Sequence, residues 1–235
     1  MVTGLVATWG LEALPLAMFF GLAVWGYLFF TLPRPESEGL QHLGFLGTLK
    51  ETLGPAVKPI ALIWLVMVLR AVVGQSFLTF MPVFYVQKGY SLVAAGGMFS
   101  LFTIAGTLSG ILSGYLSDRI GFKPIFMVTH FCMTPALLLL LYLPGAWVYA
   151  GAALAGGFVL ATMPLGVVMA QALAPKGRSM VSSLMMGLAY GLGGAFSPVV
   201  GKLADLYSIE QVLFVVAFIP LLTLVFIFFF PRVRG

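Results

Sequence analysis

Long, uninterrupted apolar runs restrict the fold of this chain more than any other feature of its sequence. Seven runs approach the length of about 20 residues that a helix needs to cross a bilayer. They cover roughly residues 10–32, 60–86, 92–116, 124–143, 147–172, 179–203 and 211–230. Because the runs do not alternate apolar with polar residues, they exclude an outer-membrane β-barrel. With 61% hydrophobic and 8% charged residues, the chain is also excluded from the soluble globular class. The sequence predicts an all-α integral membrane protein with seven transmembrane helices.

The basic residues predict how these helices are oriented. The net charge of +5 is spread over single residues and pairs rather than gathered in a stripe, so it does not indicate a nucleic-acid partner. Sorted by side of the membrane, most basic residues share one side, whereas Lys88 and Lys202 lie opposite. The positive-inside rule then places the polar stretch 33–58 and the C-terminus in the cytoplasm and the N-terminus outside. An outside N-terminus without a signal peptide leads us to expect that earlier helices are missing or come from a second subunit.

Two similar segments indicate an internal repeat. Gly114 and Asp118 at the end of one apolar run correspond to Gly201 and Asp205 at the end of another, 87 positions later. Three helices separate the two copies, so the second copy is inverted relative to the first. Inverted three-helix repeats are common in secondary transporters.

The loop after the third run has a recognisable motif. It reads Gly114-x-x-x-Asp118-Arg119-x-Gly121-x-Lys123 and resembles the loop signature of the major facilitator superfamily. In chemical terms the motif is a conformational latch. Asp118 can meet the positive N-terminus of a helix, Gly121 permits a tight turn, and the basic residues can pair with cytoplasmic acids. A solvated turn that carries positive-inside charges is the alternative.

The resemblance implies an organisation for the whole chain. Residues 1–32 would be the last helix of an N-terminal half, 33–58 the central cytoplasmic linker, and 59–235 the C-terminal six-helix half. Short stretches are further similar to the fosmidomycin-resistance group of exporters, and they lie at 85–91, 170–175, 180–187, 191–194 and 203–205. This narrower resemblance implies efflux of a small, often anionic or amphiphilic molecule, driven by the proton gradient across the inner (plasma) membrane.

Arg70 is the one charge well inside a predicted span, so it needs a partner, water or a function. In the superfamily fold the seventh and tenth helices line a central cavity, which makes Arg70 a candidate for binding an anionic substrate. A salt bridge to an acid in the missing half is the alternative. The substrate cavity is predicted to contain Arg70, Gln75, Phe77, Met163 and Gln171.

Glycines spaced by three or four residues predict two helix-packing faces, Gly106, Gly110 and Gly114 on one helix and Gly187, Gly191 and Gly194 on another. His130, about seven residues into the run 124–143, is expected to be a hydrogen-bonded packing residue, and a proton-carrying group is the alternative.

Enzyme signatures are missing from the sequence. With two distant histidines and one cysteine there is no metal cluster, no His-Glu-x-x-His and no Gly-x-Ser-x-Gly, so we expect neither a catalytic site nor a metal or other cofactor. The alternatives to a transporter are a membrane scaffold subunit that does not transport, an integral membrane enzyme, or a channel.

Overall fold

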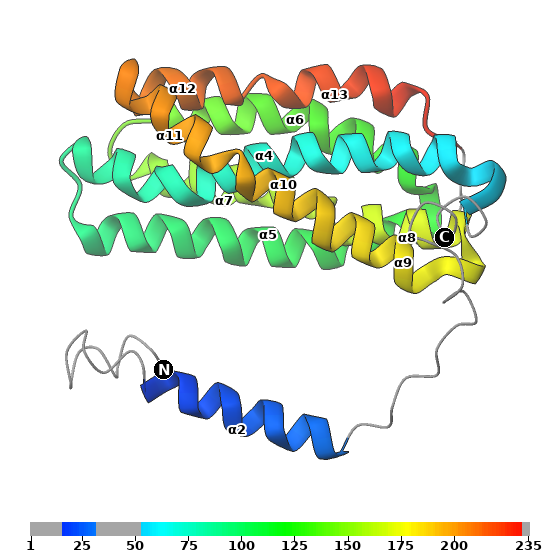
Figure 1. Ribbon diagram of the computed structural model, residues 1–235. Helices are drawn as coiled ribbons and strands as arrows, with labels where there is room; N and C mark the ends of the chain where they lie inside the picture. Colours follow the sequence, from blue (N-terminus) through cyan, green and yellow to red (C-terminus); the bar gives the residue numbers. More distant parts are fainter. Residues whose placement is uncertain (1–15, 32–52, 232–235) are drawn as a thin grey trace. The chain divides into compact units, whose positions relative to one another are not determined.

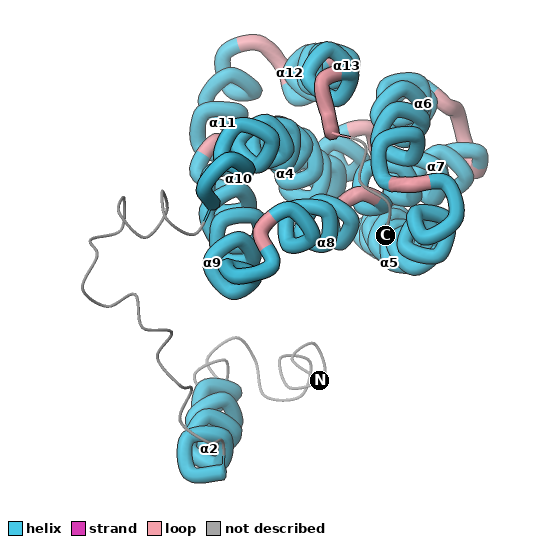
Figure 2. Tube along the Cα trace, turned by 90° about the vertical axis from the view of Figure 1, so that its right-hand side faces the viewer, coloured by secondary structure: helices cyan, strands magenta, loops and turns pink. Residues whose placement is uncertain are grey.

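The computed structural model describes residues 16–31 and 53–231, and within these residues it contains helices and no strands. Figures 1 and 2 show a bundle of long helices in the part of the chain after residue 53. Six helical stretches in this part are long and apolar enough to cross a membrane. The expected all-α membrane fold is therefore confirmed.

The first three spans are continuous helices: α4 (Val57–Gln87), α5 (Leu92–Ile120) and α6 (Phe122–Tyr142). A short 3-10 turn, Gly54–Ala56, precedes α4. Lys58, which we assigned to the linker, thus belongs to the first turn of α4. Helix α4 is the most central of the three and packs against α10 and α13 as well as α5 (Figure 2).

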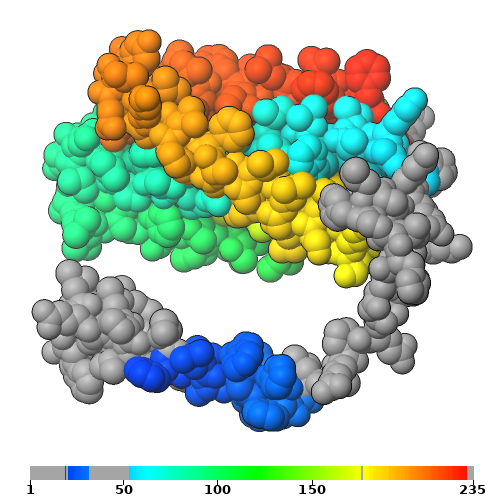
Figure 3. Space-filling model, viewed as in Figure 1, coloured from blue at the N-terminus to red at the C-terminus, as the bar shows by residue number. Residues whose placement is uncertain are grey.

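The next three spans are present but interrupted. They comprise α7 (Trp147–Ala161) and α8 (Met163–Leu173); α9 (Arg178–Ser182), a π-helical turn (Ser183–Leu188), α10 (Ala189–Ala195) and α11 (Ser197–Leu206); and α12 (Ile209–Val216) and α13 (Ile219–Phe228). A further 3-10 turn, Pro175–Gly177, joins α8 to α9. In Figure 3, α10 and α11 (yellow to orange) cross the face on which α4 and α5 are seen.

A proline accounts for each of the breaks between α7 and α8, α10 and α11, and α12 and α13. Proline has no N–H, so it cannot donate to the carbonyl four residues earlier, but it fits the first turn of a new helix. The prolines are at the second position of the following helix: Pro164 in α8, Pro198 in α11 and Pro220 in α13.

Contacts between turns show that consecutive spans run in opposite directions. At one end, Lys88 after α4 donates to the carbonyl of Leu141 at 3.1 Å, near the end of α6. At the other end, Lys123 at the start of α6 donates to the carbonyl of Phe230 at 3.3 Å, just beyond α13. The six spans after residue 53 therefore alternate in direction, as short turns between them require. The inverted repeat itself stays a prediction.

Glycines allow α5 and α7 to pack very closely. A Cβ atom added to Gly156 would lie 2.0 Å from the carbonyl oxygen of Phe102 on α5. On the α5 side, Gly106 faces Leu160 and Gly110 faces Pro164, which confirms two positions of the first predicted glycine face.

Gly114 has open space around it, and so do all three glycines predicted for the second face, Gly187, Gly191 and Gly194. That part of the prediction is wrong for contacts within the described residues. The packing glycine on this helix is Gly193, where an added Cβ would lie 2.6 Å from that of Ala71 on α4.

Helix α2 (Leu16–Thr31) belongs to a separate unit, residues 1–45, and is described by itself. Its 16 residues are predominantly apolar and include exposed Phe19, Trp25 and Phe30. The remainder of the predicted first span, most of the linker and the last basic residues of the chain lie outside the described residues.

Candidate functional site

A groove of about 520 Å³ opens on the surface of the six-span bundle. Four parts of the chain form it: α4, the middle of α5, the break between α7 and α8, and α10. Its lining residues are Leu78, Phe99, Thr103, Gly106, Thr107, Gly110, Ile111, Leu160, Met163, Pro164 and Tyr190. Most of these side chains are apolar, with three hydroxyl groups among them, which is the usual character of a small-molecule site.

Two of the three hydroxyl groups in the groove already donate hydrogen bonds to backbone carbonyls of α5. Thr103 donates to the carbonyl of Phe99 and Thr107 donates to that of Thr103, each at 2.9 Å. Their oxygens still have acceptor capacity toward the groove. None of the lining residues is charged, so recognition here would depend on shape, apolar contact and a few hydroxyl groups.

The packing of α5 explains how the groove is bordered. Gly106 and Gly110 carry no side chains, so Leu160 and Pro164, on either side of the α7–α8 break, pack directly onto α5 and border the groove together with it. Thr103 and Thr107 precede these glycines by three residues each and share their face. That spacing was present in the sequence and could have indicated the threonines, which our prediction did not include. Tyr190 was also missed, because only the glycines of its helix had been considered.

The structure separates the five residues predicted for the substrate cavity. Met163 lines the groove. Arg70 and Phe77 are buried inside the bundle, at 1% and 0% exposure, and Gln75 is half-buried on α4. Gln171, near the end of α8, donates to the hydroxyl of Ser182 at 2.6 Å.

Arg70 nevertheless lies directly behind the groove. Its guanidinium carbon is 5.8 Å from the centroid of the Tyr190 ring. Its Nη1 donates to the carbonyl of Val159 on α7 at 2.9 Å. A positive charge is therefore held one side chain away from the groove surface.

The predicted latch residues lie at the junction of α5 and α6. Helix α5 extends to Ile120, so Asp118 and Arg119 belong to its last turn instead of a following loop. The whole turn between the helices is Gly121, whose φ of 85° is in the region that favours glycine. The tight turn expected at Gly121 is thus present.

The charged latch residues make contacts that differ from the expected ones. Arg119 hydrogen-bonds to the hydroxyl of Tyr115 and lies over its ring. Lys123 donates to carbonyls at the end of α13 rather than pairing with an acid. Asp118 is exposed and forms no ion pair within residues 53–231. Gly114, one turn before it, is half-buried.

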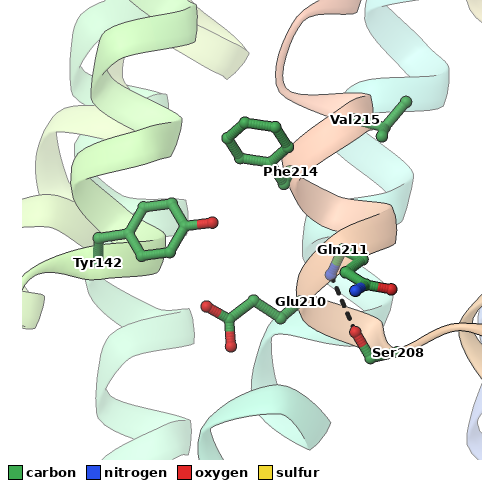
Figure 4. Close-up of a pocket in the computed structure, with 6 residues that line it drawn as sticks. All are labelled: Tyr142, Ser208, Glu210, Gln211, Phe214 and Val215. Atoms are coloured by element: carbon green, nitrogen blue, oxygen red, sulfur yellow. Dashed lines mark hydrogen bonds between the residues drawn. The ribbon is translucent and has the colours of Figure 1, made fainter.

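Another pocket, of about 470 Å³, lies between α6 and α12, at the end of the bundle opposite the Gly121 junction (Figure 4). The hydroxyl of Ser208 accepts a hydrogen bond from the Gln211 N–H at 3.2 Å and so caps α12. Glu210, which also lines this pocket, forms an ion pair with Lys88 at 3.6 Å. These polar groups hold helix ends together.

The buried histidine has a packing environment. The Nδ1 of His130 is 3.0 Å from the carbonyl of Phe126, and its ring stacks on the ring of that residue. Its surroundings on α6 agree with the expected packing role.

Comparison with known proteins places the chain in a family. The profile of the major facilitator superfamily matches residues 1–198. The fosmidomycin resistance protein of Escherichia coli (strain K12) is 33% identical over 150 residues, which are 62% of this chain and 36% of that protein. The uncharacterized MFS-type transporter YfnC of Bacillus subtilis (strain 168) is 28% identical over 141 residues, 59% of this chain and 34% of the relative. A putative metabolite transport protein of Haemophilus influenzae is 30% identical over 154 residues, 63% of this chain and 37% of the relative.

The match to each of these relatives thus spans about a third of the relative's length. The family profile, by contrast, covers most of this chain. Together with the six apolar spans, it identifies a multi-pass membrane protein of a transporter family rather than an enzyme. The chain belongs to the major facilitator superfamily.

Proposed function

We propose that this chain supplies one wall of the substrate path in a small-molecule transporter that works by alternating access. The groove between α4, α5, the α7–α8 break and α10 is the observation that carries the proposal. It is open, mostly apolar and placed midway along membrane-spanning helices. A molecule bound there needs a second wall to be enclosed on both sides.

A second helical bundle is proposed to provide that wall. It would be either an N-terminal six-helix half or a second subunit. The proposal is supported by the length of the relatives, of which the aligned segments cover about a third. On this basis the bundle described here does not transport by itself.

The proposed cargo is a small molecule, with a preference for anions, that is exported across the inner membrane in exchange for protons. A relative named for resistance to fosmidomycin supports export of a drug-like molecule. The preference for anions is supported by Arg70, which holds a positive charge behind Tyr190, a residue that lines the groove. A buried charge acts over a longer range than an exposed one because water and ions screen it less.

The proton-coupling carboxylate is proposed to lie in the second bundle. The acids of the described residues, Asp118, Asp205 and Glu210, are at the ends of helices. None of them lines the groove. The termini are proposed to lie outside (N) and in the cytoplasm (C), as the basic residues favour.

The junction at Gly121 is proposed to act as the latch between conformations. An acid in the last turn of a helix faces the negative end of the helix dipole, which is unfavourable. Asp118 occupies such a position at the end of α5. A partner that neutralises it in one state of the transport cycle would favour that state.

Filling the groove tests the proposed function. Membrane vesicles would contain the chain together with the part of the Escherichia coli relative that lies outside the aligned residues, and fosmidomycin flux would be measured under an imposed proton gradient. Thr107→Trp places a large ring in the groove and should abolish flux. Ile104→Trp is the matched control, because Ile104 is exposed on α5 and does not line the groove. Equal flux in both variants, at equal amounts of inserted protein, would refute the proposal.

A further inference from the structure

Arg70 is a buried charge that needs compensation. It is 1% exposed in the middle of α4, and the one ion pair within the described residues joins Lys88 to Glu210 instead. An isolated guanidinium within a membrane span is strongly unfavourable. Because the surrounding helices enclose it, an acid from outside this bundle cannot reach it without rearrangement. The compensating group must therefore be found among its neighbours.

The neighbour of opposite polarity is the C-terminal end of α7. The last four carbonyls of a helix lack intrahelical partners and carry the negative end of its dipole, equivalent to about half a charge. Val159 is among the last four residues of α7, and its carbonyl accepts the hydrogen bond from Arg70 Nη1 at 2.9 Å. Charge and helix end thus stabilise each other.

This contact is beside the break that shapes the groove. Helix α7 ends at Ala161, Thr162 forms the break, and α8 begins at Met163. Leu160, Met163 and Pro164, on both sides of the break, line the groove. The hydroxyl oxygen of Thr162 is buried and has no hydrogen-bond partner, so the break has no side-chain cap of its own.

The other side of the guanidinium faces α10, which also lines the groove. Tyr190 on α10 lies over Arg70 with 5.8 Å between the ring centroid and the guanidinium carbon. A cation at this distance is attracted to the face of the ring. Arg70 thereby contacts both the end of α7 and Tyr190 of α10, which border the groove, although Arg70 itself does not line it.

We propose that Arg70 is a positioning residue, whose guanidinium binds the carbonyl end of α7 and the face of Tyr190 and so fixes the shape of the α7–α8 break at the groove. It does this without touching the transported molecule. The proposal rests on the proposed function only in taking the groove as the substrate path. The positioning itself can be measured without any substrate.

Thiol labelling of the groove wall tests the positioning role. The full chain would carry Cys132→Ala, and a single cysteine would be introduced either at Met163, next to the break, or at Thr107, on the opposite wall. The rate of reaction with a small charged methanethiosulfonate would be measured in liposomes. Arg70→Met removes both the charge and the donor, and Arg70→Gln keeps a donor but removes the charge. Ser76→Ala is the control, because Ser76 is a buried polar residue of α4 that bonds within its own helix, to Val72.

We expect Arg70→Met to change the labelling rate at position 163 by about tenfold, the shift that follows from losing a hydrogen bond to a charged group. Arg70→Gln should have a smaller effect in the same direction. Position 107 should keep its parental rate in both variants, and Ser76→Ala should change neither position. Hydrogen exchange of residues 157–166 should rise in parallel with labelling.

The proposal would be overturned if both Arg70 variants showed the same labelling rate at position 163 and the same hydrogen exchange at the break as the parent. That result would mean that Arg70 only contacts substrate or only supports folding, because neither role changes the shape of the empty groove in the folded protein. If Arg70→Met does not fold, Arg70→Gln decides the question by the same readouts. The result is independent of flux. The Arg70 variants could alter labelling and exchange at the break while Thr107→Trp leaves flux unchanged. That combination would refute the proposed function but support the positioning role of Arg70.

Discussion

The close contact between α5 and α7 gives a quantitative prediction for Gly156. A Cβ atom at this position would lie 2.0 Å from the carbonyl oxygen of Phe102 and 2.6 Å from its carbonyl carbon. An ordinary contact begins near 3.4 Å, so the two backbones would have to separate by about 1.4 Å. Backbone atoms cannot rotate away as a side chain does, and overpacking of this kind destabilises by about 1–3 kcal/mol.

The matched control is the next residue along the helix. Gly157→Ala adds the same methyl group, but nothing lies within 4 Å of it. Both substitutions gain about 1 kcal/mol in helix propensity, so the difference between them isolates the clash. We expect Gly156→Ala to melt about 6 to 12 °C below Gly157→Ala, if the clash reaches about 3 kcal/mol and each kcal/mol shifts the melting temperature by about 2–4 °C.

The single cysteine of the chain provides the assay. Cys132 is half-buried on α6, so a thiol-reactive dye would report its exposure as the detergent-solubilised protein is heated. Equal melting temperatures for the two alanine variants would refute the reasoning, because α5 and α7 would then not approach as closely as described.

Two further predictions concern polar contacts at helix ends. Thr134→Val should destabilise the protein by about 1–3 kcal/mol in the same thermal assay. The hydroxyl of Thr134 donates to the carbonyl of Ala217 at 2.7 Å, in the break between α12 and α13, and that buried carbonyl would lose its partner. A variant as stable as the parent would contradict this prediction. Glu210→Gln should lower stability by less than about 1 kcal/mol at low salt and not at all at high salt. The reason is that the side chains of Glu210 and Lys88 are 40% and 35% exposed, so salt screens the pair. A large effect that persists at high salt would contradict this prediction and show that the pair is effectively buried.

Several features of this protein followed from the sequence alone. The length of the apolar runs predicted the six spans after residue 53, since a bilayer fixes how many residues a helix needs to cross it. The motif around Asp118 predicted the tight turn at Gly121, because only glycine readily adopts the positive φ of that turn. The spacing of Gly106 and Gly110 predicted a close helix contact.

Other features were decided by the tertiary structure. The sequence predicted that Arg70 and Phe77 would line the substrate cavity, but in the structure other helices cover both side chains, and Leu78 lines the groove instead. Similarly, the glycine-rich helix offered several packing positions, and only its rotation against α4 selects Gly193.

The physical reason is the solvent. In water, the polar face of a helix reveals its exposed side, so sequence periodicity separates surface from core. In a bilayer, lipid tails are as apolar as the protein interior, and the buried and lipid-facing sides of a helix therefore have similar composition. Hydropathy determines where this chain crosses the membrane, whereas the rotation of each helix, and with it the groove and the position of Arg70, is set only by packing between helices.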